Sequence, residues 1–275
     1  MRLTPHVPVL ILLLLSAFSK SAEAQPANAV EPEAQSAGED SSGSTNNTLA
    51  SKEELYLDRK EAFSNPKADN PELPNVLLIG DPISIGYTAY VRRQLTGKAD
   101  VFRISTNGKN SAYGLAQLDK WLALGSIKWD VIHFNWGLWD LCYRHPKSKT
   151  QGNRDRVNGT LTESLDGYRA NLEKIVARLK ETEATLIWCA TTPVPEGEAG
   201  RKTGDDLKYN QVAAEIMKAN GVLINDLHSH ALLKLPETMV REGDVHFTEP
   251  GYIHLADKVS LEISSAIAKQ TKERQ

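Results

Sequence analysis

Cysteine is scarce in this sequence, with only Cys142 and Cys189 among 275 residues. Their spacing gives no metal-binding motif, and one bridge between them or two buried free thiols both fit the pattern. An excess of positive charge is also missing, since the net charge is -3, the pI is near 6.2 and Lys and Arg are scattered. The sequence therefore gives no sign of a nucleic-acid partner.

Long apolar runs are confined to the N-terminus, where "VPVLILLLLSAF" follows Arg2 and "SAEA" places small residues at Ala22 and Ala24. This pattern predicts a signal peptide over residues 1–24, cleaved before Gln25. The run is shorter than an ordinary membrane span, and an uncleaved anchor is the alternative. We expect a secreted or periplasmic protein with no membrane attachment after cleavage.

Residues 25–70 contain Pro, Ala, Ser, Gly and acidic residues with few large apolar side chains, particularly before residue 50. Such a segment buries too little surface to offset the entropy of ordering it, so we predict a disordered acidic and polar linker. Within it, "SKEELYLDRKEAF" (51–63) has the composition of a short helix. Residues 271–275 are interpreted as a tail.

From residue 75 onward, apolar runs alternate with amphipathic helical patterns. Strands that are apolar along their whole length and separated by helices predict a parallel sheet covered on both faces. We therefore predict one three-layer α/β/α domain with a five-stranded parallel sheet over residues 71–270. The strands are expected at 75–80, 99–105, 129–137, 184–192 and 222–226, and the helices at 83–96, 112–124, 162–182, 205–220 and 249–269.

Two motifs follow predicted strands or precede the last helix. In "GDPISIGY", a Gly-Asp turn at Asp81 joins the first strand to a helix N-terminus, where backbone N–H groups favour developing negative charge. In "DVHFTEPGY", Asp244 lies two residues before His246, so its carboxylate can orient the imidazole and leave the other ring nitrogen free to act as a base. Both motifs are expected at the carboxyl edge of the sheet, where ligands bind in such folds.

Together, "LLIGDPISIGY" and "DVHFTEPGY" resemble the first and last sequence blocks of the SGNH, or GDSL-type, hydrolases. The segments "NGKNSAYGLAQLDKWL" and "HFNWGLWDL" are similar to the second and third blocks, so the resemblance covers about residues 71–270. It implies a flavodoxin-like fold and cleavage of acyl or acetyl esters, often on carbohydrates, with no metal and no other cofactor.

The resemblance also implies roles for individual residues. The catalytic Asp and His of the family fall on Asp244 and His246, which are both present. The second-block glycine, whose N–H serves the oxyanion hole, falls on Gly108, with Lys109 leaving the register open by one residue.

Two signature positions depart from the family pattern. In "GLWD" (137–140), Trp139 stands before Asp140 where the family has its oxyanion-hole Asn, and Asn135 could replace that amide only with a rearranged loop. The place of the nucleophilic serine falls on Pro82. Proline has no hydroxyl and no N–H, yet it suits the first position of a helix, so the fold tolerates it and the serine mechanism does not.

Three groups are candidates to replace the serine. Ser84 is two residues further along the helix and should point to its other side, since two residues turn it by about 200°. Asp81 is a candidate carboxylate nucleophile, although ordering the turn is its more ordinary role. His246, oriented by Asp244, could activate water directly as a general base.

Side chains near the end of the third predicted strand suggest a binding surface. Trp136, Trp139, Tyr143 and His133 could stack on a sugar ring, with Asp140 and Arg144 as polar contacts, although either Trp could equally pack the sheet against a helix. The "HSH" at 228–230 is too sparse to predict a metal site.

The sequence therefore supports two functions. One is a secreted hydrolase-like protein that acts on acyl esters, acetyl esters foremost, of carbohydrates, with its activity reduced by Pro82. The other is a non-catalytic protein that binds the carbohydrate or ester in the same cleft. A flavodoxin-type cofactor protein is disfavoured, because the turn after the first strand lacks the Gly, Ser or Thr residues that cradle a phosphate.

Overall fold

The computed structural model describes residues 60–68 and 70–274, with only the backbone of residues 273 and 274. The predicted signal peptide and most of the predicted linker lie outside these residues, as does the predicted 51–63 helix except for its helical end at 60–63. Within the described part of the chain, no helix combines the length and apolar character needed to cross a membrane.

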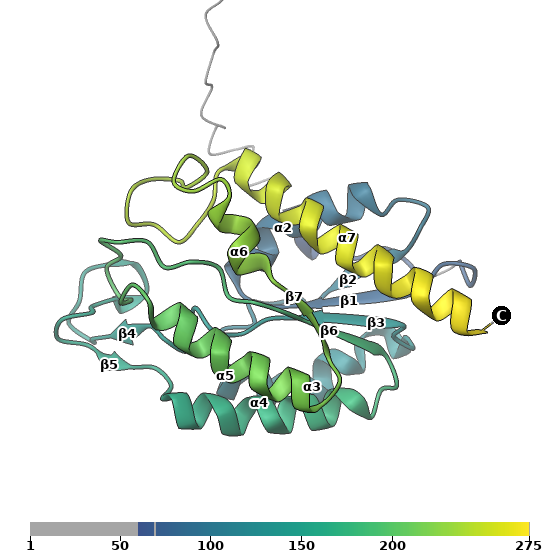
Figure 1. Ribbon diagram of the computed structural model, residues 1–275, viewed down its shortest axis with the longest axis horizontal. Helices are drawn as coiled ribbons and strands as arrows, with labels where there is room; N and C mark the ends of the chain where they lie inside the picture. Colours follow the sequence, from purple (N-terminus) through teal and green to yellow (C-terminus); the bar gives the residue numbers. More distant parts are fainter. Residues whose placement is uncertain (1–59, 69, 275) are drawn as a thin grey trace, which may run out of the picture. The chain divides into compact units, whose positions relative to one another are not determined.

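A five-stranded parallel sheet forms the centre of the domain, as the sequence predicts (Figure 1). The order of its strands is β2-β1-β3-β6-β7. The strands are shorter than predicted, because the residues beyond their carboxyl ends turn away into loops. Their bounds are β1 (Asn75–Ile79), β2 (Asp100–Arg103), β3 (Val131–Phe134), β6 (Thr185–Cys189) and β7 (Leu223–Asn225).

Helices cover both faces of the sheet (Figure 1). One layer contains α2 (Pro82–Gln94), α6 (Leu227–Leu232) and α7 (Glu249–Arg274), and the other contains α3 (Ser111–Leu122), α4 (Leu165–Lys180) and α5 (Asp205–Ala219). The predicted boundaries shift at two places. Helix α7 runs past residue 269 through the predicted tail to Arg274, because neither Gly nor Pro interrupts that segment. Helix α6 was not predicted, and Asp226 caps it by accepting the Ser229 N–H at 3.0 Å.

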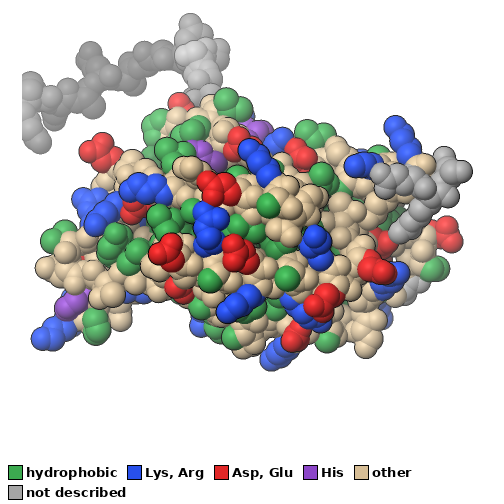
Figure 2. Space-filling model, turned by 60° about the horizontal axis from the view of Figure 1, so that its bottom comes forward, with side chains coloured by type: hydrophobic (Ala, Val, Ile, Leu, Met, Phe, Trp, Pro, Cys, Tyr) green, Lys and Arg blue, Asp and Glu red, His purple; other side chains and the backbone are tan. Residues whose placement is uncertain are grey.

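The outer face of the α3, α4 and α5 layer mixes charges of both signs (Figure 2). Arg169 on α4 pairs with Glu215 on α5 at 2.6 Å, and Arg178 pairs with Asp119 on α3 at 2.7 Å. Exposed pairs of this kind add little to stability, so burial of the inner helix faces holds the layer in place.

Glycines allow two of these helices to pack closely. A Cβ at Gly86 of α2 would lie 2.1 Å from the ring of Tyr252 on α7, and one at Gly114 of α3 would lie 2.4 Å from the indole of Trp136. Trp136 is fully buried beyond the end of β3, so its ring has little room to move.

Two short strands that the sequence analysis missed form an excursion between β3 and α4. Strands β4 (Tyr143–Arg144) and β5 (Thr160–Leu161) pair antiparallel. One 3₁₀ turn, η2 (Gln151–Asn153), lies between them, and another, η1 (Leu124–Ser126), precedes β3. Helix α4 begins at Leu165 rather than at residue 162, because the Ser164 hydroxyl caps it by accepting the Gly167 N–H at 3.1 Å.

The packed domain also extends to residues before its predicted start at residue 71. Asn65 lies against the edge strand β2, where its side chain accepts the Arg103 N–H at 2.8 Å and donates to the Arg103 carbonyl at 2.9 Å. A side-chain amide thus satisfies backbone groups that an edge strand leaves unpaired. Ala62 is fully buried as well.

The strand order places a functional region at one edge of the sheet. The chain passes from β1 to β2 on one side and then to β3 on the other side, so the connections diverge beyond the carboxyl ends of β1 and β3. Ligands bind at such switch points in open α/β sheets. The loops that follow β1 and β3 contain Asp81, Pro82 and Trp139.

We predict that Gly114→Ala lowers the free energy of unfolding by about 1 to 3 kcal/mol, because the new methyl group would overlap the Trp136 ring. Urea denaturation measures the change. Ala116→Ser, at an exposed position of the same helix, should alter stability by no more than about 0.5 kcal/mol. Equal effects of the two substitutions would contradict the packing argument.

Candidate active site

The turn after β1 places Asp81 and Pro82 at the start of α2. The Asp81 carboxylate caps the helix by accepting the Ile83 N–H at 3.0 Å, and Pro82 is the first helical residue. Burial raises the pKa of the Asp81 carboxyl, against the opposing effect of the Ile83 bond. The local role expected for Asp81 in ordering the turn is therefore present, and both residues also line a cavity.

Ser84 points away from that cavity, as helical geometry predicts. Its hydroxyl donates to the Asp81 carbonyl at 2.8 Å and accepts from Nη2 of Arg103 at 2.9 Å, and the residue is buried. The hydroxyl is thus occupied on the inner side of α2, where no substrate can reach it.

Arg103, at the end of β2, is the buried cation beneath this turn. Its guanidinium donates to the carbonyls of Gly80 at 2.9 Å, Ile104 at 2.8 Å and Thr106 at 2.9 Å. Burial lowers the pKa of Arg103 to about 10, so the group stays charged at neutral pH. The sequence analysis missed this residue, although an arginine inside the apolar run "ADVFRIS" was a signal that could have found it.

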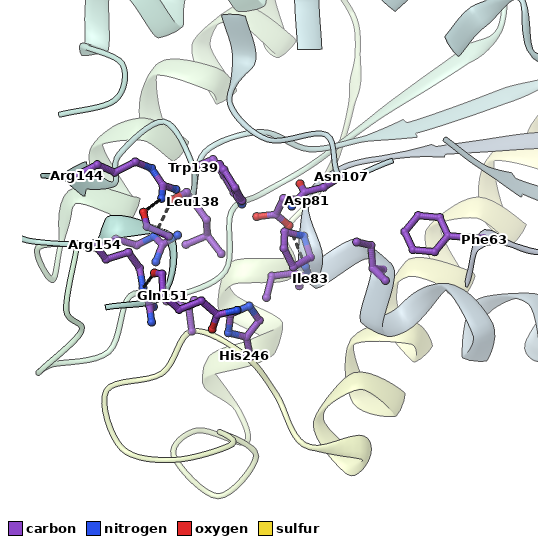
Figure 3. Close-up of a pocket in the computed structure, with 15 residues that line it drawn as sticks. Phe63, Asp81, Ile83, Asn107, Leu138, Trp139, Arg144, Gln151, Arg154 and His246 are labelled. Carbon is purple, nitrogen blue, oxygen red and sulfur yellow. Dashed lines mark hydrogen bonds between the residues drawn. The ribbon is translucent and has the colours of Figure 1, made fainter. Parts of the chain in front are cut away.

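Asp244 and His246 form a hydrogen-bonded pair in the loop before α7. Nδ1 of His246 lies 2.7 Å from Oδ1 of Asp244, whose other oxygen accepts from Arg241 at 2.6 Å. The bond from His246 is the largest cause that lowers the pKa of Asp244, from 3.8 to about 2. The His246 side chain is 33 % exposed and borders the cavity, so its Nε2 remains for a ligand (Figure 3).

A cavity of about 480 Å³ brings these groups together (Figure 3). The chain segments around it come from the segment before β1, the β1–α2 turn, the loops after β2, β3 and β6, the excursion, and the loop before α7. In the part of the chain that the structure describes, none of the side chains that line it carries a hydroxyl or a thiol. They are Phe63, Asp81, Pro82, Ile83, Ile85, Asn107, Leu138, Trp139, Arg144, Gln151, Arg154, Arg201, Val245 and His246, with the backbone of Gly152.

A second cavity of about 220 Å³ adjoins the first. Pro82, Gln151 and His246 line both spaces. Tyr90, Phe247 and Tyr252 give the smaller one an aromatic lining. His246 therefore lies on the boundary between the two cavities.

Gly108 does not offer the free N–H that the family resemblance implies. Its N–H donates to the Gly80 carbonyl at 2.9 Å, and a Cβ there would lie 2.7 Å from the same oxygen. This glycine is needed for the close approach of two loops, and its backbone donor is used between them. The neighbouring residue Asn107 lines the cavity instead, and the sequence analysis did not consider it.

Asn135 is also engaged elsewhere. Its amide donates to the Cys189 carbonyl at 2.6 Å and to the Thr191 hydroxyl at 3.3 Å, so it joins the loops after β3 and β6. It does not line the large cavity, and the interpretation of Asn135 as a substitute oxyanion donor is not supported by this geometry.

Trp139 and Asp140 are neighbours with different surroundings. Trp139 lines the cavity and is covered on one face by the guanidinium of Arg144, 4.5 Å from the ring centre. Asp140 is fully buried and caps α3 by accepting from the N–H of Ser111 at 2.8 Å and its hydroxyl at 2.6 Å. Burial raises the pKa of Asp140 to about 7. The helix and the loop enclose Asp140, which does not line the cavity, so this geometry gives no support to the expected ligand contact.

The remaining members of the predicted aromatic cluster do not reach the cavity. Trp136 is fully buried and donates to the Gly108 carbonyl at 3.1 Å, and His133 is buried beside Asn225 at 3.1 Å. Tyr143 lies under Lys202, whose Nζ is 4.3 Å from the centre of its ring. Trp139 and Arg144 are the members of the cluster that line the cavity.

Three arginines from two segments form one wall of the cavity, and two of them were missed from the sequence. Arg144 and Arg154 come from the excursion after β3, and Arg201 comes from the loop after β6. Arg154 and Arg201 share the buried carboxylate of Glu198, at 2.6 and 3.0 Å. The basic residues at 144–156 were a signal, but only the fold shows which of them turn inward.

The cysteines and the "HSH" motif lie outside the cavity lining. Cys142 and Cys189 are buried free thiols. His228 pairs with Asp206 at 2.7 Å, and His230 stacks on His254 with ring centres 3.9 Å apart. Within residues 60–68 and 70–274, no three potential metal-ligating side chains gather in one place.

Comparison with known families agrees with this arrangement. The model of the GDSL-like lipase/acylhydrolase family matches residues 79–253, from the end of β1 into α7, and the chain therefore belongs to this family. None of the curated proteins matches the chain.

Solved structures with the same architecture include two acetyl xylan esterases. Axe2, an acetylxylan esterase from Geobacillus stearothermophilus, is 19% identical with a TM-score of 0.55 over 69% of this chain and 94% of that chain. The acetyl xylan esterase AlAXEase is 18% identical with a TM-score of 0.54 over 69% and 99%. A lipase/acylhydrolase from Enterococcus faecalis is 19% identical with a TM-score of 0.55 over 70% and 96%. These likenesses show the SGNH hydrolase fold.

We predict that Ser84→Ala lowers the free energy of unfolding by about 1 to 2 kcal/mol, because Arg103 loses a buried hydrogen-bond partner. Any ester hydrolysis by the folded protein should be unchanged. Chemical denaturation and an esterase assay measure the two effects. Ser265→Ala, on the exposed side of α7, is the matched control. Loss of hydrolysis by fully folded Ser84→Ala would identify Ser84 as a nucleophile.

The low pKa of Asp244 makes a prediction about pH. The folded-state pKa lies below the ordinary value, so the carboxylate stabilises the fold above about pH 4 and loses this contribution as the pH falls towards 2. The difference in unfolding free energy between the native protein and Asp244→Asn should therefore shrink by about 1 kcal/mol over that range. In a His246→Ala background most of this pH dependence should vanish, and its persistence would contradict the pairing.

Proposed function

We propose that this protein acts on acyl esters, acetyl esters foremost, of carbohydrates outside the cytoplasm, and that it hydrolyses them slowly without a serine nucleophile. The observation that carries the proposal is that Pro82 and His246 line the same cavity. Membership of the GDSL-like lipase/acylhydrolase family supports ester chemistry, and the acetyl xylan esterases among the similar structures suggest the substrate class. The predicted signal peptide supports export.

His246 would act as the base in this mechanism. Asp244 holds Nδ1, and Nε2 would take a proton from a water molecule as that water attacks the ester carbonyl carbon. The tetrahedral intermediate would then collapse, and the same proton would pass to the departing sugar oxygen, giving a carboxylic acid and an alcohol. The amides of Asn107 and Gln151 are neutral side-chain donors on the lining that could stabilise the oxyanion.

Asp81 is less suited to nucleophilic attack than water. One of its oxygens is held by the Ile83 N–H, and the carboxyl is buried with a raised pKa, which lowers the fraction ionised at a given pH. Proline at position 82 adds no donor beside it. Asp81 is therefore assigned to ordering the turn.

A second candidate function is binding without turnover. Among the described residues, no side chain that lines the large cavity carries a hydroxyl or a thiol, which favours binding alone, because the acyl-enzyme route of a serine esterase needs such a group. The same cavity would then recognise the acylated carbohydrate and release it unchanged.

Acetate release from acetylated xylo-oligosaccharides separates these functions. We predict slow release by the native protein, loss of that release in His246→Ala, and a rise of roughly 10²-fold or more in Pro82→Ser, since a missing nucleophile costs a serine hydrolase most of its rate. Pro250→Ser is the matched control, because Pro250 is also in the first turn of a helix and lies outside the cavity lining.

The other results have definite meanings. No release by the native protein, with activity in Pro82→Ser, would establish binding as the function. Release that survives His246→Ala would overturn the proposed role of His246. No release by either protein, on xylo-oligosaccharides or on small acetyl esters, would contradict the ester proposal.

A further inference from the structure

On one wall of the cavity, the arginine side chains outnumber the carboxylates that could neutralise them. Arg144, Arg154 and Arg201 line it; among the described residues, Asp81 is the carboxylate on the lining, and Glu198, behind the wall, is the one that pairs with Arg154 and Arg201. Three guanidiniums therefore face two carboxylates. Arg144 and Arg154 lie together on one side of the cavity in Figure 3, with Asp81 and His246 on other sides.

Both carboxylate oxygens of Glu198 already accept hydrogen bonds. The residue is completely buried, and one of its oxygens accepts from Arg154 at 2.6 Å and from Arg201 at 3.0 Å. The other oxygen accepts the Gly200 N–H at 2.6 Å. A single carboxylate thus fixes two guanidiniums at the wall and leaves their combined charge only half neutralised.

Arg144 is the guanidinium without an acidic partner among the described residues. It stacks on Trp139 and donates through Nη1 to the Gly152 carbonyl, which leaves the rest of its five N–H groups unbonded. Gly152, with φ 71°, allows this contact, because a Cβ there would lie 2.9 Å from Nη1. The side chain is partly buried, and burial lowers the pKa of Arg144.

A partly buried guanidinium placed over an indole ring is preorganised to bind a planar or tetrahedral anion. Its remaining donors form a fork that matches two oxygens of one acid group, and charge-assisted bonds of this kind are short and strong. A neutral sugar hydroxyl would leave the excess charge on the wall uncompensated.

The geometry points to a subsite for an anionic group on the wall formed by Arg144, Arg154 and Arg201, so that the preferred ligand is an acylated acidic saccharide bearing a carboxylate or a sulfate. This inference rests on the proposed function, and it deepens that function by naming the substrate class. The ester would lie near Pro82 and His246 while the acid group of the same saccharide lies on the arginine wall.

Calorimetric titration of the full chain with three probes tests the subsite. The probes are O-acetylated trigalacturonate, the same trimer with its carboxyl groups reduced to alcohols, and an O-acetylated, O-sulfated galactotriose. We expect at least one acidic probe to bind about ten-fold or more tightly than the reduced trimer, with an affinity that falls as salt is added. The carboxylate and sulfate probes show which acid group is preferred.

Variants of the wall connect this preference to Arg144. Arg144→Gln should weaken binding of the preferred acidic probe about ten-fold while leaving the reduced trimer unaffected, and Arg144→Lys should recover part of the loss. Arg169→Gln removes the same charge from the exposed face of α4 and should have no effect. Gln151→Glu is a second variant, since the Gln151 side chain lines the cavity and no hydrogen bond of it would be lost. It should weaken the acidic probes more than the reduced trimer, because the added carboxylate repels the acid group, whereas loss of the Gln151 amide affects both kinds of probe alike.

The outcomes separate the subsite from the proposed function. Equal affinity for acidic and reduced probes, or an Arg144→Gln protein that melts normally and still prefers acidic probes, would overturn the anion subsite and leave ester recognition standing. If deacetylated trigalacturonate binds as tightly as its acetylated form and depends on Arg144, the subsite is supported and ester recognition is not. No binding of any probe would overturn both.

Discussion

The buried guanidinium of Arg103 is the interaction on which the candidate site depends. It joins the turn after β1, through the Gly80 carbonyl and the Ser84 hydroxyl, to the loop after β2, through the Thr106 carbonyl. Separating the loops would take hydrogen-bond acceptors away from a buried charge at a high energetic cost, so these two loops have little freedom to separate. The positions of Pro82 and the adjoining cavity lining follow from this constraint.

The same turn explains how the fold accommodates Pro82 at the start of α2. The first position of a helix needs neither a side-chain donor nor an N–H, and Asp81 caps the helix without help from its neighbour. The fold therefore needs only a residue that can begin a helix at position 82, whereas a serine mechanism would need a hydroxyl there. The pair of Asp244 and His246 keeps its geometry regardless of residue 82, because the pair is held by its own loop and by Arg241.

The charge of the cavity lining comes from parts of the chain that lie outside the sheet. Arg144 and Arg154 belong to the excursion between β3 and α4, and Arg201 follows β6, yet Glu198 binds two of them to one carboxylate. The shared fold supplies the position of the cavity, while these loops supply its charge. This division agrees with the general behaviour of α/β folds, in which loops at one edge of the sheet carry specificity.

The sequence by itself determined the alternation of apolar strands and helices, and with it the five-stranded parallel sheet. Its local motifs also predicted the pairing of Asp244 with His246, because the partners are two residues apart. Only the tertiary structure decided the hydrogen-bond partners of Gly108, Asn135 and Asp140, which come from distant segments of the chain. Periodicity and short motifs report on neighbours along the chain, whereas a hydrogen bond or a buried charge is settled by whichever group the fold places nearest in space.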